Sequence, residues 1–206
     1  MRGHITNMDK LVEICKSLDI KIIEDCAHTM GAKWSGKRSG NFGIVSAFST
    51  QTYKHINSGE GGFLTTNDEQ IIAKAIIHSG SYMLYGRHES SPNDDIFENI
   101  KLKSANFSGR MDNLRSAILI PQLSKLDNKI VQWNKLYDEI SNNLKRQNGI
   151  FLPTRDKKEY YVGSSIQFRL KEFDDNLIKL FVNNCKSRGV DLKWFGDKNP
   201  IAYTSR

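Results

Sequence analysis

Apolar residues near the start of the chain recur at helical spacing, at Met8, Leu11, Val12, Cys15 and Leu18. The segment that follows, KIIED at residues 21–25, is short and apolar and ends in acidic residues. A short apolar run of this kind is typical of a buried strand, whereas the spacing before it is typical of an amphipathic helix. The pattern therefore predicts a helix and then a strand.

The same alternation continues along the first half of the chain. After a glycine-rich turn region, the apolar runs GIVSAFS (43–49) and GGFLTT (61–66) precede the helical pattern DEQIIAKAII (68–77). Helices between short strands predict an α/β sheet, whose ligands usually bind at the carboxyl ends of the strands. Asp25 and Ser49 both fall at such ends.

The middle of the chain shows two further patterns. Residues 79–109 are polar and poorly periodic, which predicts a long excursion that serves as a lid or as an oligomer contact. From Met111 to about Lys145 the pattern is helical again. Pro121 lies inside it, and a proline costs about 3 kcal/mol in a straight helix, so we expect a kink or break there.

The end of the chain mixes strand-like and helical patterns, namely NGIFLP, the alternating SSIQFRL, the helical DDNLIKLFVNNCKSRG and the short VDLKWF. This mixture predicts a small α+β unit. We therefore divide the chain into a large α/β part over residues 1–110, a connecting helical segment over 111–148, and a small C-terminal part over 149–206.

Composition narrows the class of protein. With 206 residues, 38% of them apolar and 10% aromatic, the chain can fill a core. No window resembles a membrane span, and MRGHITNMDK lacks the apolar segment of a signal peptide, so we expect a cytoplasmic protein without a membrane partner. Three widely spaced cysteines, Cys15, Cys26 and Cys185, suggest buried free thiols and neither a disulfide framework nor a metal site.

The net charge of +7 raises the question of an anionic partner. The basic excess lies in the second half of the chain, and such a face can attract nucleic acid or any phosphorylated ligand. Here the basic residues alternate with acidic ones, as in KLDNK, RDKKEY and LKEFDD. Because nucleic-acid-binding proteins usually gather their cations on one face, we expect no nucleic-acid partner.

One lysine has an unusual setting, Lys54 in FSTQTYKHINSGEGG at residues 48–62. Taken singly, the polar residues here have plain explanations: a solvated loop lysine, a helix cap at Asp25, a half-buried His28 and a turn-forming Ser49. Together, a lysine, a carboxylate and a hydroxyl are the groups that pyridoxal phosphate requires, to bond its aldehyde, its ring nitrogen and its phosphate.

The order IIEDCAH, FSTQTYK, GEGGFLTTND and GRMDNLRSAIL resembles the DegT/DnrJ/StrS family of sugar aminotransferases, which are pyridoxal phosphate enzymes of fold type I. The resemblance runs from His4 to Arg206. It implies a partial large domain, with a mixed sheet flanked by helices, and part of a small α+β C-terminal domain. It also implies a homodimer that transfers an amino group from glutamate or glutamine to a nucleotide-linked keto sugar, for cell-surface polysaccharide or related sugar biosynthesis.

The resemblance assigns roles to single residues. Lys54 matches the lysine that bonds the cofactor and then acts as base for the proton shift. Asp25 matches the carboxylate that pairs with the ring nitrogen, His28 the residue beside the ring or its phenolic oxygen, and Ser49 the hydroxyl that binds the phosphate. The segment Glu60 to Gly62 matches the loop after the lysine, where we expect it to shape the backbone.

Two departures from the family bear on the site. Two residues before Arg110 the family commonly has an asparagine that reaches the phosphate in the neighbouring subunit; here Ser108 stands there, with Asn106 nearby. His55 follows Lys54, and a dehydratase branch has histidine in place of the lysine. The spacing of five residues from Ser49 selects Lys54, which favours amino transfer.

A third departure concerns the ends of the chain. The family's chains begin well before MRGHITNMDK, with a segment that donates hydrogen bonds to the phosphate, and they continue beyond KWFGDKNPIAYTSR. We therefore expect an internal fragment of the family's chain. Two alternatives stay open, a non-catalytic remnant of the family and a relative of its sugar dehydratases.

Overall fold

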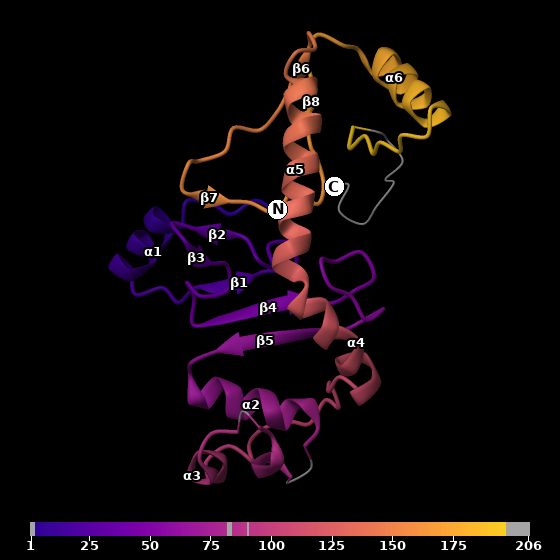
Figure 1. Cartoon of the computed structure of the whole chain (residues 1–206). Helices are drawn as coiled ribbons and strands as arrows, with labels where there is room; N and C mark the ends of the chain where they lie inside the picture. Colours follow the sequence, from indigo (N-terminus) through magenta and orange to yellow (C-terminus); the bar gives the residue numbers. More distant parts are fainter. Residues whose placement is uncertain (1–2, 82–83, 90, 197–206) are drawn as a thin grey trace. The chain divides into compact units, whose positions relative to one another are not determined.

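The computed structural model describes residues 3–81, 84–89 and 91–196, and these divide into two compact units (Figure 1). The first unit comprises Met1–Asp138 together with Arg155–Ser165, and the second comprises Glu139–Thr154 together with Ile166–Arg206. The segment Arg155–Ser165 thus belongs to the first unit although both of its neighbours along the chain belong to the second. The three-part division of the sequence stays a prediction.

The sheet that carries the site has three strands in the order β1-β4-β5. β1 (Ile23–Asp25) is parallel to β4 (Val45–Ser49), and β4 is antiparallel to β5 (Gly62–Thr66). This mixed sheet with flanking helices confirms the predicted α/β class. Because β1 and β4 are parallel, with Asp25 opposite Ala47, their carboxyl ends meet at one edge of the sheet.

A second small sheet has the order β3-β2-β7. β2 (Lys33–Trp34) and β3 (Lys37–Arg38) form a hairpin, and β7 (Glu159–Tyr160) pairs antiparallel with β2. Trp34 is 2% exposed, so this pairing covers a large apolar side chain. β7 brings a distant part of the sequence into the first unit, and no pattern in the sequence indicated it.

Helices flank the sheet, with caps that the sequence supplies. α1 (Met8–Ser17) begins at Asn7, whose side chain accepts a hydrogen bond from the Lys10 backbone N–H at 3.1 Å. α2 (Glu69–Ser79) begins at Asp68, whose Oδ1 accepts from the N–H groups of Gln70 and Ile71. Both caps satisfy N–H groups that a helix start leaves without a partner.

The long excursion predicted for residues 79–109 has structure of its own. It contains the short helices η1 (Tyr85–Arg87) and α3 (Asp94–Glu98), and α3 packs against α2 through the fully buried Phe97. Ile100 is buried in the same cluster. A helix of five residues is too short to give a helical period, so sequence analysis missed it.

Two helices follow, α4 (Asn113–Ser124) and α5 (Leu126–Leu144). Pro121 lies inside α4, and the helix continues to Ser124 before its cap at Lys125. The break expected at Pro121 therefore lies almost one turn later. Ser124 Oγ donates to the Pro121 carbonyl at 3.0 Å in this last turn.

The core of the first unit joins distant segments. Its buried apolar residues come from the turn after β1, the loop after Lys54, helices α4 and α5, and the segment Arg155–Ser165: Met30, Ala32, Ile56, Leu119, Leu126, Ile130 and Val162. Glu24 holds the turn before β4, because its carboxylate accepts from the N–H groups of Gly40 and Gly43 at 2.8 and 2.7 Å.

The second unit contains a two-stranded sheet and one helix. β6 (Ile150–Phe151) pairs antiparallel with β8 (Arg169–Leu170), and α6 (Asp175–Ser187) starts at the Asp174 cap. The strand-like NGIFLP and SSIQFRL contain β6 and β8, and α6 lies where the periodicity predicts it. Across the described residues of both units, no helix combines the length and the apolar character needed to cross a membrane.

Candidate active site

The edge formed by the carboxyl ends of β1 and β4 carries two of the predicted side chains. Asp25 ends β1, and its Oδ1 accepts a hydrogen bond from the Ala27 N–H at 3.0 Å, while the residue stays exposed. Ser49 ends β4 and is half-buried, with its Oγ accepting from the Gln51 N–H at 3.3 Å. The edge thus presents one carboxylate and one hydroxyl.

The structure also brings Lys54 and His28 together. Lys54 Nζ lies 3.0 Å from His28 Nε2, although the residues are 26 positions apart. Both side chains are half-buried, His28 in the turn after β1 and Lys54 in the loop after β4. Because two cations at this distance repel, the contact favours a neutral imidazole that accepts a hydrogen bond from the lysine. The contact therefore holds the Lys54 amine at a defined place.

The loop that carries Lys54 has a fixed backbone. The Lys54 N–H donates to the Gln51 carbonyl, and the Ser58 N–H donates to the Thr50 carbonyl, both at 2.9 Å. The fully buried Thr50 also bonds Ser58, with their hydroxyl oxygens 3.0 Å apart. These contacts close the loop around Lys54 and therefore fix the position of its backbone.

Gly61 is needed for this loop to close. Its φ is +130°, and a Cβ there would lie 2.6 Å from Met111 Cε and 3.0 Å from Thr50 Oγ1. A side chain would have to displace the flexible end of Met111 and press on Thr50, and it would be strained in this backbone conformation, which favours glycine. This is consistent with the loop-shaping role expected of the segment that begins at the exposed Glu60.

Helix α4 holds the loop from one side in a way that sequence analysis missed. The Gln122 side chain accepts from the Asn57 N–H at 3.0 Å and donates to the Asn57 carbonyl at 2.7 Å. Both backbone groups of one loop residue are thus satisfied by one amide side chain. A glutamine beside Pro121 gives no sequence signal for such a pairing.

His55, the neighbour of Lys54, has a separate environment. Its Nε2 lies 2.9 Å from Ser164 Oγ, and its ring centroid lies 5.6 Å from that of Trp133. Burial, with smaller contributions from the charges of His28 and Lys54, lowers the pKa of His55 to about 4. The imidazole is therefore neutral near pH 7.

The remaining predicted residues, Asn106 and Ser108, lie beside the C-terminal end of α2. The Phe107 N–H donates to the His78 carbonyl at 2.9 Å, and the Arg110 N–H donates to the Ser79 carbonyl at 3.0 Å. Within the segment, the Ser108 N–H donates to Asn106 Oδ1 at 2.8 Å. Both side chains are exposed, and a role in binding phosphate stays a prediction.

Solved structures identify the class of this fold as fold type I, that of pyridoxal phosphate-dependent aminotransferases. The chain superposes on DesV of S. venezuelae with a TM-score of 0.75 at 25% identity, over 93% of this chain and 47% of that chain. It matches E. coli GDP-4-keto-6-deoxy-D-mannose-3-dehydratase with bound hydrated PLP with the same TM-score and identity, over 93% of this chain and 50% of that chain.

The chain belongs to the DegT/DnrJ/EryC1/StrS aminotransferase family, whose model matches residues 1–201. The resemblance drawn from the motifs is thereby confirmed. Among curated relatives, GDP-perosamine synthase of Escherichia coli O157:H7 is 30% identical over 175 residues, which cover 85% of this chain and 45% of that protein. The chain spans about half the length of the curated relatives it matches.

Proposed function

We propose that the protein transfers an amino group from glutamate or glutamine to a keto sugar, with pyridoxal phosphate bonded to Lys54. The observation that carries this proposal is the contact of Lys54 with His28, whose side-chain nitrogens lie 3.0 Å apart. The two residues follow the parallel strands β1 and β4, whose carboxyl ends carry Asp25 and Ser49. An amine, an imidazole, a carboxylate and a hydroxyl match the reactive groups of this cofactor.

The donor set fits pyridoxal phosphate group by group. The exposed carboxylate of Asp25 would hold the ring nitrogen protonated, the Ser49 hydroxyl would donate to the phosphate, and His28 would lie beside the ring. When bound, pyridoxal phosphate supplies an electron sink for the charge left when a C–H bond next to the amino group breaks. Lys54 would take that proton at Nζ and return it, and His28 would accept a hydrogen bond from the resulting ammonium.

The family and the charge of the chain support the proposed substrate class. GDP-perosamine synthase is named for a product attached to a nucleotide. A nucleotide-linked keto sugar carries a diphosphate, and the net charge of +7 suits an anionic substrate. We extend the proposal to a cytoplasmic protein that makes amino sugars for polysaccharide. We further propose a homodimer in which Asn106 and Ser108 of one subunit approach the phosphate site of the other.

A dehydratase activity is the second candidate, because a solved dehydratase has the same fold and His55 adjoins Lys54. Two observations support amino transfer instead. His55 is engaged by Ser164 and packs on Trp133, whereas Lys54 is the residue in contact with His28. The lysine therefore has the geometry expected of the residue that bonds the cofactor.

The test is an assay with ¹⁵N-labelled glutamate or glutamine and nucleotide-linked keto sugars, in protein supplied with pyridoxal phosphate. We expect ¹⁵N in an amino sugar product from wild-type protein and none from Lys54→Arg, a charge-preserving control. Loss of the sugar hydroxyl without transfer of ¹⁵N would support the dehydratase. If neither product forms although pyridoxal phosphate is bound, the non-catalytic remnant would be the correct description.

A further inference from the structure

We propose that His55 and Ser164 are positioning residues for Lys54, and that the segment Arg155–Ser165 is the support against which the lysine is held. The inference rests on the proposed function of Lys54. It assigns a role to Ser164, which neither the motifs nor the family resemblance singled out, and it gives His55 a role other than the one that the dehydratase branch suggests. Neither residue needs to touch substrate or cofactor.

Three consecutive residues of the loop have three different environments. Lys54 reaches His28 at the candidate site, His55 reaches Ser164, and Ile56 is fully buried in the core. Because the three residues are consecutive, contacts that fix His55 and Ile56 also restrict the position of the Lys54 backbone. The His55 ring is held at two places, at Nε2 by Ser164 Oγ and on its side by Trp133 of α5.

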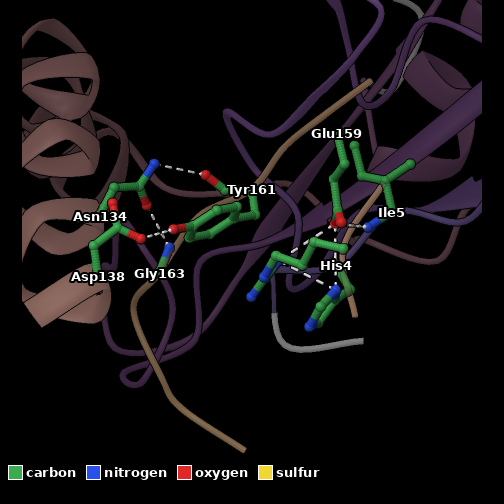
Figure 2. A network of polar contacts seen from close by, with 8 residues as sticks. His4, Ile5, Asn134, Asp138, Glu159, Tyr161 and Gly163 are labelled. Atoms are coloured by element: carbon green, nitrogen blue, oxygen red, sulfur yellow. Dashed lines mark hydrogen bonds and ion pairs between the residues drawn. The ribbon is translucent and has the colours of Figure 1, made fainter. Parts of the chain in front are cut away.

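The supporting segment is itself anchored to α5, as Figure 2 shows. Asn134 Nδ2 donates to the Tyr161 carbonyl at 2.9 Å, and Asn134 Oδ1 accepts from the Gly163 N–H at 2.7 Å. The Tyr161 hydroxyl donates to Asp138, one helical turn further along α5. The backbone just before Ser164 is therefore held by Asn134, at the Tyr161 carbonyl and at the Gly163 N–H.

A second group of contacts ties the same segment to the N-terminal residues. Glu159 accepts from the Ile5 N–H at 2.9 Å and lies 3.4 Å from His4 Nδ1 (Figure 2). The Arg155 guanidinium stacks 3.7 Å from the centroid of the Tyr161 ring and lies 3.4 Å from Glu159. The Glu159 side chain is only 3% exposed, so water weakens this ion pair little.

The segment also supports His28, the partner of Lys54. The Val162 N–H donates to the Gly3 carbonyl at 3.4 Å, and the Gly3 N–H donates to the His28 carbonyl at 2.8 Å. A Cβ on Gly3 would lie 2.1 Å from the Val162 carbonyl oxygen, so the two backbones approach closely. The segment Arg155–Ser165 therefore supports both residues of the Lys54–His28 contact. Ser164 supports Lys54 through His55, and Val162 supports His28 through Gly3.

The hydrogen-bond inventory of His55 indicates which nitrogen carries its proton. Nδ1 is buried and makes no hydrogen bond within the part of the chain that the structure describes. A buried N–H without an acceptor costs more than a buried lone pair without a donor. The proton therefore belongs on Nε2, which donates to Ser164 Oγ.

The test compares amide hydrogen exchange in wild-type protein, Ser164→Ala and Ser164→Thr, without cofactor. Ser164 is exposed, so both variants should fold, and threonine keeps the hydroxyl. We expect the Lys54 and Ser58 amides to exchange about fivefold faster in Ser164→Ala, which corresponds to the loss of one hydrogen bond. Ser164→Thr should exchange like wild-type protein, and the α2 amide of Ile72 should not respond to either change.

Unchanged exchange at Lys54 and Ser58 in Ser164→Ala would overturn the inference. An equal rise at Ile72 would overturn it too, because that result shows a general loss of stability. Reduction with borohydride after addition of pyridoxal phosphate gives a separate readout, in which labelling of Lys54 should fall in Ser164→Ala and recover in Ser164→Thr. If wild-type protein takes no label at Lys54, the proposed function fails, whatever the exchange rates show.

Discussion

Asp25→Asn is expected to lower the turnover of protein loaded with pyridoxal phosphate by roughly a hundredfold or more, the usual effect of removing one group aimed at developing charge. An amide carries no charge, so it cannot hold the ring nitrogen protonated. The asparagine Oδ1 can still accept from the Ala27 N–H, as Asp25 does at 3.0 Å, so the turn after β1 should persist. Turnover at saturating cofactor is the measurement.

Ser49→Ala is the matched control for Asp25→Asn. It removes a phosphate donor at the neighbouring strand end, so we expect it to weaken cofactor binding while turnover at saturation changes less. The two variants should therefore separate affinity from chemistry. Near-parental turnover of Asp25→Asn at saturating cofactor would show that Asp25 serves only to cap the turn.

The second large effect concerns stability against pH. Burial lowers the pKa of His55 in the folded protein to about 4 from its ordinary value of 6.5. Below pH 6.5 the unfolded chain takes up a proton at this site while the folded protein does not, so stability is lost as pH falls from 6.5 towards 4. The full loss is up to about 3 kcal/mol, at 1.36 kcal/mol for each pKa unit.

Urea unfolding of wild-type protein and His55→Gln at pH 7.5 and at pH 4.5 measures this loss. Glutamine does not titrate, so the variant should lack the part of the pH dependence that His55 contributes. Subtracting the two proteins removes the contributions that both share. Equal pH dependence in both would contradict a neutral, half-buried His55 and would oppose its assignment as a positioning residue.

Local patterns predicted the elements that are long enough to show a period. β4 and β5 lie where short apolar runs predict strands, and α2 and α6 lie where helical spacing predicts helices. The helix α3 was missed because five residues show little period, and β7 because a strand of two residues depends on its partner β2. The position of the break was also predicted too early, because α4 continues almost one turn beyond Pro121.

For the candidate site, too, local patterns indicate some residues and miss others. Strand ends and motif spacing in the sequence indicate Asp25, Ser49 and Lys54 as candidates, and their roles stay predictions. The structure adds the contact of Lys54 with His28. Contacts between distant segments have no such signal, as with Gln122 on Asn57 and Ser164 on His55. They depend on how α4 and the segment Arg155–Ser165 pack, which residue spacing does not determine.

The central claim is that Lys54 is the residue that bonds pyridoxal phosphate. Adding pyridoxal phosphate to the protein, reducing with borohydride and mapping the modified peptide by mass spectrometry tests it most directly. The claim predicts a pyridoxyl group on Lys54, with Lys54→Arg unlabelled and the neighbouring peptides unchanged. A pyridoxyl group on another lysine, with Lys54 unmodified, would contradict it.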